Sequence, residues 1–322
     1  MPLIRAADLE LTRDELAAVT ARFGVRAMEP LGGYENLLFR STDPGGVVLR
    51  VTHTSRRSPE EVLGEVEFLE HLAAEGCSVV RPVRSTDGEL CVEWTTGKGE
   101  PVLTMAMTEA PGARRRPALW AEPEIETYGR TLAELHRAAR SFEPSRPAHR
   151  RPSWFDPRLD PGYGDDPLRQ RHDQLVERAR ALPAGGTDLL IHMDAHHGNL
   201  HLTEDGVLTL FDFDDCAYAT PTHDLALCIY YWFFRAEDQG LEAIRSFTRP
   251  FLRGYASVQP LPDDWPRGVD EFLSLREVDL LFLLRSSPID DPGVSGFMER
   301  ARRHIESDAP YLDAPAEEWA TP

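Results

Sequence analysis

The chain of 322 residues is almost devoid of lysine. Of its 35 basic residues only Lys98 is a lysine, so all the others are arginines. Any site that needs a cation is therefore expected to use arginine, whose planar guanidinium binds carboxylates and phosphates through paired hydrogen bonds. Acidic residues outnumber basic residues, so the formal net charge is −19. Such a chain lacks the broad basic surface that a nucleic-acid partner requires, and its acidity favours a cationic ligand.

Cysteine and long apolar runs are scarce as well. The four cysteines are widely spaced and form no C-x-x-C pair, which argues against a zinc site or a disulfide framework. The longest strongly apolar stretch, Leu225 to Phe234, is about half as long as a membrane span needs. The first residues, Met1 to Arg5, turn polar at once and lack the apolar core of a signal peptide. We therefore expect a cytoplasmic protein without a membrane segment.

Capping and turn signals divide the chain into two parts. Strand-like runs with an inserted helix fill residues 1–107, whereas residues 108–322 are mostly helical in pattern. Capping boxes predict helices that begin at Thr12 and at Ser58. Further expected helices contain 128–139 and 225–234 and recur through 262–322, and expected strands cover 37–42, 47–52, 90–95, 102–107, 189–193 and 207–213. This order predicts an α+β fold in which a small antiparallel-sheet lobe precedes a larger helical lobe.

The most informative stretch begins at His192 and reads H-M-D-A-H-H-G-N, followed after a strand–turn–strand by F-D-F-D-D. Phosphoryl transfer from ATP needs a carboxylate that accepts or orients the hydroxyl proton of the acceptor. It also needs an amide oxygen and a second carboxylate that hold Mg²⁺. Asp194 and Asn199 have the five-residue spacing of a kinase catalytic loop, and Asp212 follows where a metal-binding carboxylate is expected. The pattern predicts Asp194 as catalytic base, with Asn199 and Asp212 as metal ligands.

Two other interpretations of this stretch stay open. It can be a surface loop with assorted polar side chains, although apolar strands flank both acidic clusters. It can also be a metal-hydrolase cluster around zinc or manganese, built from His192, Asp194, His196, His197 and Asp212. Against the second interpretation, no other His-rich spacing in the chain supplies the companion ligands of such an enzyme.

With these motifs the chain resembles the aminoglycoside phosphotransferase-like superfamily, which includes antibiotic kinases, homoserine and choline kinases, and a bacterial stress-response kinase. The family loop reads H-G-D-x-H-x-G-N, and this chain departs from it at Met193, where the family has glycine. The resemblance implies a two-lobed protein-kinase-like fold with ATP and Mg²⁺ as cofactors. It also implies that His192 braces the catalytic loop and that Asp224 anchors it, and it makes His136 a packing histidine.

The resemblance extends to nucleotide-binding positions in residues 1–107. Arg50 stands where the family has its ATP-binding lysine, and Glu65 is expected to pair with it, with Glu67 as the nearest competitor. The glycines of a G-G-x-x-N turn would let the backbone approach phosphates, and a hinge would offer its backbone to the adenine. The implied nucleotide-binding set is Gly32, Gly33, Asn36, Arg50, Glu65, Met105 and Met107.

The phosphoryl acceptor is the least determined part of this interpretation. The leading hypothesis is a hydroxyl of a small molecule, an antibiotic or an amine-bearing metabolite, with Asp214 and Asp215 in the substrate pocket. One alternative is a protein Ser/Thr kinase of the stress-response type, and another is a pseudokinase that binds nucleotide without catalysis. The segment from Trp265 to Arg285 contains no pattern that indicates a ligand.

Overall fold

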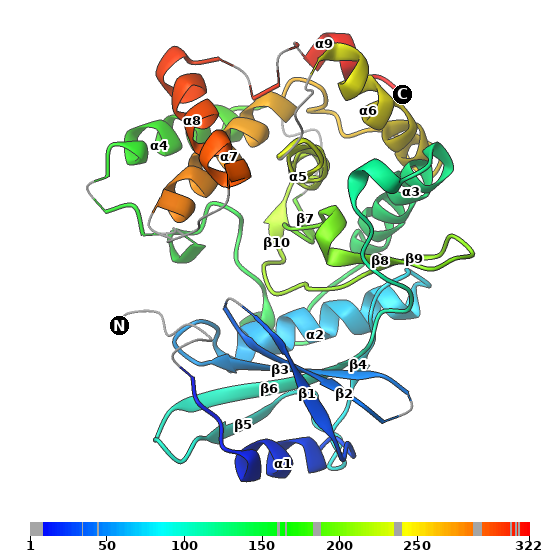
Figure 1. Cartoon of the computed structure of the whole chain (residues 1–322), viewed down its shortest axis with the longest axis vertical. Coiled ribbons are helices and arrows are strands. Elements are labelled where there is room, and N and C mark those ends of the chain that lie inside the picture. Colours follow the sequence, from blue (N-terminus) through cyan, green and yellow to red (C-terminus); the bar gives the residue numbers. More distant parts are fainter. Residues whose placement is uncertain are drawn as a thin grey trace. The chain divides into compact units, whose positions relative to one another are not determined.

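The computed structural model describes most of the chain (Figure 1). The described residues are 9–33, 35–43, 45–159, 162–164, 166–182, 188–234, 240–285, 292–309, 311–312, 314 and 316–322. The stretch Met1 to Arg5, on which the expectation of no signal peptide rests, lies outside these ranges. Within them, no helix combines the length and the apolarity that a membrane crossing demands.

The contacts within the chain define two compact units. Unit 1 comprises Met1–Pro111, Ser141–Arg151 and Thr209–Asp214, and unit 2 comprises Gly112–Arg140, Pro152–Leu208 and Asp215–Pro322. Both units are therefore assembled from separate segments, whereas the predicted division at residue 107 cuts the chain once.

Unit 1 is built on a six-stranded sheet whose order is β1-β2-β3-β6-β4, with β5 also paired to β6. Every pair is antiparallel. The strands are β1 (Met28–Gly32), β2 (Leu37–Ser41), β3 (Val47–His53), β4 (Pro82–Val83), β5 (Val92–Thr95) and β6 (Pro101–Thr108).

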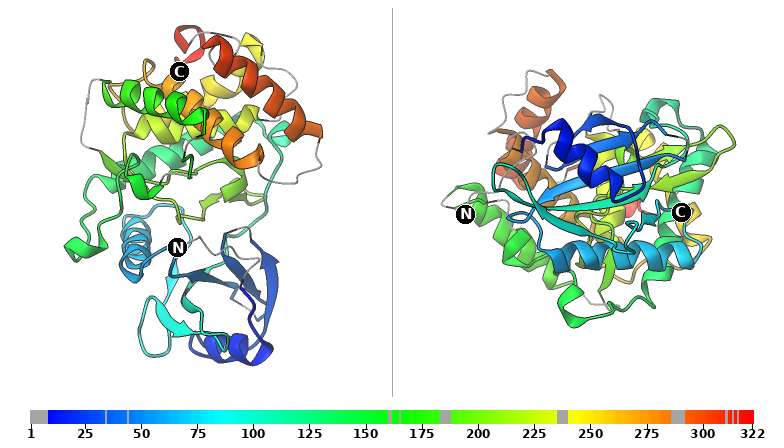
Figure 2. Two further views of the ribbon diagram at one scale, coloured as in Figure 1. Left: turned by 90° about the vertical axis from the view of Figure 1, so that its left-hand side faces the viewer. Right: turned by 90° about the horizontal axis from the view of Figure 1, so that it is seen from below.

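Two helices cover opposite faces of this sheet (Figures 1 and 2). Both α1 (Arg13–Ala21) and α2 (Pro59–Ala74) begin at the predicted capping boxes. Successive side chains of a strand point to opposite faces, and β3 uses both. Leu49 and Val51 join the apolar cluster that includes Val19 of α1, while the intervening residue reaches α2, as described below.

The two later segments of unit 1 pack against α2. The Phe68 ring lies 5.1 Å from the ring of Phe142 and 6.0 Å from that of Phe213. Close approach here requires glycine, because a Cβ on Gly64 would stand 2.1 Å from the carbonyl oxygen of His149. The short helix η3 (Pro147–His149) and part of strand β9 (Leu208–Leu210) belong to these segments.

Unit 2 is mostly helical, with short strands. Its β10 pairs antiparallel with β7, and its helices α3 and α6 approach closely at two glycines. A Cβ on Gly129 would stand 1.8 Å from a carbonyl oxygen of α6, and one on Gly254 would stand 1.9 Å from a carbonyl oxygen of α3. The elements are η2 (Pro117–Leu119), α3 (Glu122–Ala139), η4 (Pro157–Leu159), α4 (Leu168–Arg180), β7 (Leu189–Ile191), η5 (His197–Asn199), β8 (Leu200–Leu202), β10 (Ala217–Ala219), α5 (Pro221–Phe233), α6 (Leu241–Ala256), α7 (Val269–Arg285), α8 (Pro292–Ser307) and α9 (Ala316–Trp319).

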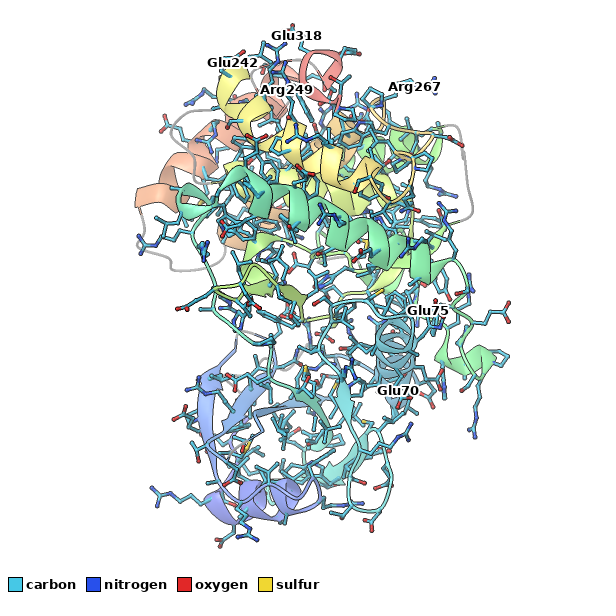
Figure 3. All side chains as sticks on the ribbon, turned by 90° about the vertical axis from the view of Figure 1, so that its right-hand side faces the viewer. Glu70, Glu75, Glu242, Arg249, Arg267 and Glu318 are labelled. Carbon is cyan, nitrogen blue, oxygen red and sulfur yellow. The ribbon has the colours of Figure 1, made fainter. Side chains whose placement is uncertain are left out.

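The C-terminal helix α9 closes one end of unit 2. Arg245 of α6 donates to the carbonyl oxygen of Glu318 at 3.1 and 3.0 Å and to the Glu242 carboxylate at 3.0 Å. Figure 3 labels Glu242 and Glu318 at this end. The described residues thus confirm an α+β fold with an antiparallel-sheet part and a helical part. The strands expected at 189–193 and 207–213 end earlier, at Ile191 and Leu210.

Candidate active site

The loop after β7 is anchored by one buried carboxylate. Asp224, in the first turn of α5, accepts backbone hydrogen bonds from His192 at 2.9 Å and from Met193 at 2.7 Å. His136 of α3 completes the arrangement, since its Nε2 lies 3.0 Å from Asp224 and its Nδ1 lies 2.9 Å from the hydroxyl of Tyr255. Burial raises the pKa of Asp224, but the hydrogen bond and charge of His136 and the contacts with His192 outweigh it and lower the pKa. The anchor is therefore ionised, and these are the contacts that the predicted loop anchor would make.

Met193 occupies a backbone conformation that favours glycine. Its φ is 66°, in the left-handed region that L-residues with a side chain rarely adopt. This geometry explains why glycine suits the same position in the family loop. The Met193 N–H is held by Asp224, so the anchor helps to keep the strained conformation in place.

Asp194 is oriented through one of its two carboxylate oxygens. Its Oδ2 accepts a hydrogen bond of 2.8 Å from Nδ2 of Asn199 and lies 3.4 Å from Nε2 of His196. Its Oδ1 is buried and has no hydrogen-bond partner among the described residues, although Nη2 of Arg276 lies 3.6 Å away. Burial raises the pKa of Asp194, but the contacts with His196 and then the charge of Arg276 outweigh it, so the pKa is lowered. The carboxylate is ionised with one oxygen open to a donor.

The neighbouring histidines have distinct roles. His196 accepts the Gly198 N–H at its Nδ1 over 2.8 Å, so its ring proton is on Nε2 and faces Asp194. His192 likewise accepts the Asp194 N–H at its Nδ1, over 3.2 Å. Burial lowers the pKa of His197 to about 4, which keeps that ring neutral at physiological pH.

These assignments weigh against the metal-hydrolase interpretation. Within the described part of unit 2, no three His, Cys, Asp or Glu ligand atoms that include one of these histidines come within reach of a single ion. His192 and His196 also each commit one ring nitrogen to a backbone N–H.

The side chain of Asn199 suits a metal ligand. Its amide forms its hydrogen bonds through Nδ2, which donates to the backbone oxygen of Asp194 at 3.0 Å and to its carboxylate at 2.8 Å. The amide oxygen therefore accepts no hydrogen bond in the described part of the chain, and it can offer its lone pairs to a hard cation. The other predicted ligand, Asp212, belongs to unit 1, is exposed and has a φ of 67°.

The predicted cation of unit 1 is part of a buried ion pair. Arg50 of β3 donates from Nη1 and Nη2 to the two carboxylate oxygens of Glu65 on α2, at 2.8 and 2.5 Å. The two side chains are only 2% and 1% exposed. Burial lowers the pKa of Arg50, but the charges of Glu65, Asp214 and Asp212 outweigh it, so the guanidinium stays charged. The competitor Glu67 instead pairs with His149 at 2.8 Å.

Asp214 does not have the surroundings of a substrate carboxylate. Burial raises its pKa, but the charges of Arg50, Arg57, Arg56 and Arg151 outweigh it and hold the pKa well below the ordinary range. The expectation that Asp214 receives a cationic acceptor does not fit, because four guanidinium groups already neutralise it. Asp215, the other expected pocket residue, is exposed and belongs to unit 2.

Arginines that the sequence interpretation missed hold the segment after Asp212 in place. Arg57 donates to the carboxylate of Asp214 at 3.2 Å and to its backbone oxygen at 3.1 Å. Arg151 donates to the same backbone oxygen at 2.6 Å and to that of Glu61 at 3.0 Å. The only sequence signal was the reliance on arginine, because neither residue lies within a recognisable motif.

The turn after β1 has glycine where the backbone requires it. Gly32 and Gly33 have φ values of 85° and 134°, and a Cβ on Gly33 would stand 2.0 Å from the carbonyl oxygen of Asn36. The Asn36 amide donates to Asp214 at 3.0 Å, and its buried Oδ1 has no partner within the described ranges.

The expected hinge residues lie inside the sheet. Met105 and Met107 belong to β6, which has β3 on one side and β4 and β5 on the other. A central strand directs its backbone donors and acceptors to neighbouring strands. The register pairs Met105 with Arg50 of β3, and it pairs Met107 with Val48 of β3 and Pro82 of β4. Their expected role at an adenine stays a prediction.

Comparison with known proteins places the chain in a family. The family model described as "Phosphotransferase enzyme family" matches residues 27–261. The chain belongs to this family. Amicoumacin kinase of Bacillus subtilis (strain 168) is 30% identical over an alignment of 314 positions that covers 92% of each protein.

Solved structures agree with that assignment. An amicoumacin kinase in complex with AMP-PNP and Ca²⁺ matches with a TM-score of 0.83 at 26% identity, over 95% of this chain and 97% of that one. A microcompartment-associated aminopropanol kinase matches in fold with a TM-score of 0.72 at 21% identity, over 92% and 98% of the two chains. The predicted kinase-like fold is confirmed. The chain is an ATP-dependent phosphotransferase that acts on a hydroxyl of a small molecule, as the leading hypothesis expected.

Proposed function

We propose that Asp194 orients the acceptor hydroxyl through Oδ1 and takes its proton, while Asn199 and Asp212 hold Mg²⁺ against the phosphates of ATP. The observation that carries this proposal is the asymmetry of the Asp194 carboxylate. Asn199 and His196 fix Oδ2, whereas Oδ1 is buried without a hydrogen bond from the described residues. A hydroxyl group would supply the missing donor, and the lowered pKa of Asp194 keeps the carboxylate ionised to receive it.

The chemistry is an in-line displacement at the γ-phosphorus of ATP. The acceptor oxygen forms a bond to that phosphorus, the bond to the β–γ bridging oxygen breaks, and ADP leaves with the electron pair. Asp194 receives the hydroxyl proton and passes it to solvent. Bound Mg²⁺ would neutralise charge on the phosphates, and the amide oxygen of Asn199 and the carboxylate of Asp212 are suitable ligands for it.

Other residues would support these groups. Asp224 and His192 hold the catalytic loop through backbone hydrogen bonds. Arg50, fixed by Glu65, would supply positive charge to the nucleotide phosphates, and Gly32 and Gly33 would allow their close approach. The relatives named above suggest an acceptor that is an antibiotic or an amine-bearing metabolite.

Substitution of the two aspartates separates binding from chemistry. Mg²⁺ and ATP together should raise the melting temperature of the wild type, because a ligand that binds only the folded state stabilises it. Asp212→Ala should lose this shift. Asp194→Ala should keep it and lose turnover, measured as acceptor-dependent ADP release, by about 10²- to 10⁴-fold.

Glu204→Gln, on the turn after β8, is the matched control and should retain both the shift and the turnover. Wild-type turnover in Asp194→Ala would refute its role as base. An unchanged shift in Asp212→Ala would refute its role as a metal ligand.

A further inference from the structure

A single arginine stands beside the open oxygen of Asp194. Arg276 lies in the middle of α7, and its Nη2 is 3.6 Å from Oδ1 of Asp194. Its Nε donates to the hydroxyl of Tyr231, on α5, at 3.0 Å, and its guanidinium lies 5.1 Å from the centre of that ring. The Tyr231 ring is in turn 4.3 Å from the ring of His196. Contacts from α5 and from the loop that carries Asp194 therefore fix the position of the guanidinium.

The guanidinium of Arg276 does not use all of its hydrogen-bond donors within the described residues. Its hydrogen bonds use Nε and Nη2, both toward Tyr231, and Nη1 has no partner in the part of the chain that the structure describes. The side chain of Arg276 is 25% exposed and that of Asp194 is 21% exposed, although Oδ1 of Asp194 itself is buried. An unused hydrogen-bond acceptor and unused hydrogen-bond donors therefore stand next to each other.

The charge of Arg276 determines which chemical group of an acceptor its free hydrogen-bond donors can bind. Burial lowers the pKa of Arg276, but the contact with the Tyr231 hydroxyl and the charge of Asp194 outweigh it, so the guanidinium stays cationic. Burial raises the pKa of Tyr231 to about 12, so its hydroxyl stays neutral and brings no negative charge at physiological pH. An ammonium group cannot accept a hydrogen bond from these donors, whereas a carboxylate or a carbonyl oxygen can.

We propose that Arg276 is a specificity residue that binds a carboxylate or amide carbonyl of the acceptor, a few bonds from the hydroxyl held by Asp194. The inference rests on the proposed function and narrows it to hydroxy acids and hydroxy amides. Any ammonium group of the acceptor then lies on the side away from Arg276. An arginine suits this task better than a lysine would, because its fork holds a planar carboxylate while it also contacts Tyr231.

Paired acceptors test this class directly. L-Homoserine and 3-amino-1-propanol differ only in the carboxylate, and L-serinamide and ethanolamine differ only in the amide. The readout is the ratio of kcat/KM within each pair, from acceptor-dependent ADP release by the full chain. The wild type should favour the carbonyl-bearing member. Arg276→Met should reduce that ratio by about 10- to 100-fold, mainly through KM, which is the loss expected for a hydrogen bond to a charged group.

Two further variants separate recognition from structure. Arg276→Lys keeps the charge without the fork, and it should retain part of the preference for the carboxylate but little of that for the amide. Arg178→Met is the matched control, because it removes a guanidinium that pairs with Glu271 of α7 at 2.9 Å. The control should leave both ratios unchanged.

Three results would overturn the proposal. In the first, Arg276→Met lowers kcat/KM equally for both members of a pair, as expected if Arg276 only holds Asp194. In the second, the wild type prefers the members without a carbonyl. In the third, it turns over no carbonyl-bearing acceptor while Mg²⁺ and ATP still stabilise it. Absence of that stabilisation would instead contradict the proposed function itself.

Discussion

Single residues of the loop after β7 have conformations that their neighbours impose. Met193 has a left-handed backbone because Asp224 holds its N–H and that of His192. A residue with a side chain in this region is strained by about 1 to 2 kcal/mol. Loop geometry is thus maintained by a buried carboxylate against the preference of the methionine.

Replacement of Met193 by glycine should release this strain. Met193→Gly is expected to leave the free energy of unfolding unchanged or raise it by up to about 1 kcal/mol, because strain relief slightly exceeds the entropy that glycine adds to the unfolded chain. Urea denaturation measures the change. Met107→Gly, inside β6, is the matched control and should lose about 2 to 5 kcal/mol, because it leaves a cavity in a buried strand. Equal losses in the two variants would contradict the strain assigned to Met193.

At the same scale, local spacing made part of the site predictable. The five-residue spacing of Asp194 and Asn199 indicated that the two side chains lie close together, and a hydrogen bond of 2.8 Å joins them. The anchoring role of Asp224 was implied by the family resemblance and not by a short spacing. Arg276 was missed because it reaches Asp194 through the packing of α7, 82 residues further along the chain. The surroundings of Asp214 were missed because its four arginines come from residues 50–57 and from Arg151, both far along the chain, and no sequence spacing reveals this.

At the scale of elements, the start of α7 holds a carboxylate in an unfavourable place. Burial raises the pKa of Asp270 to about 6, with added repulsion from Glu317 and Glu271. Its Oδ1 has no hydrogen-bond partner within the described ranges. A carboxyl whose pKa is raised by folding favours the folded state when it is protonated. Its contribution is therefore full below the ordinary pKa and is lost as the pH rises through about 6.

Removal of this charge should stabilise the protein at neutral pH. Asp270→Asn is expected to raise the free energy of unfolding at pH 7 by about 2 kcal/mol, because the buried charge disappears. The difference from the wild type should shrink toward pH 4, as urea titrations at several pH values would measure. Glu306→Gln, an exposed carboxylate of α8, is the control and should show no such pH dependence. A constant difference across this range would refute the assignment.

The starts of helices α1 and α2 were predicted correctly, whereas the order of the strands was not predicted. Helices α1 and α2 begin at their predicted capping boxes, because those signals are local. The expected strand at 102–107 is β6, yet its place at the centre of the sheet was not predicted. Strand order depends on pairing between distant segments, which local sequence signals do not reveal.

At the scale of the whole molecule, unit 1 is not a continuous stretch of sequence. Its N-terminal part requires Ser141–Arg151 and Thr209–Asp214 to cover α2 and to neutralise Arg50. A fragment of residues 1–111 should therefore lack a cooperative thermal transition, as followed by circular dichroism. Co-expression with residues 112–322, which contain both missing segments, should restore it. A cooperative transition in the isolated fragment would contradict this division.

The return of the chain at Thr209–Asp214 also has a consequence for synthesis on the ribosome. Residues up to Pro111 emerge first, but the last segment of unit 1 follows about a hundred residues later. At bacterial or eukaryotic rates of about 5 to 20 residues per second, this interval lasts on the order of 5 to 20 s. During that time Phe68 of α2 has no Phe213 to cover it. The nascent sheet is therefore a candidate for chaperone binding, and folding of unit 1 is completed only after most of the protein has been translated.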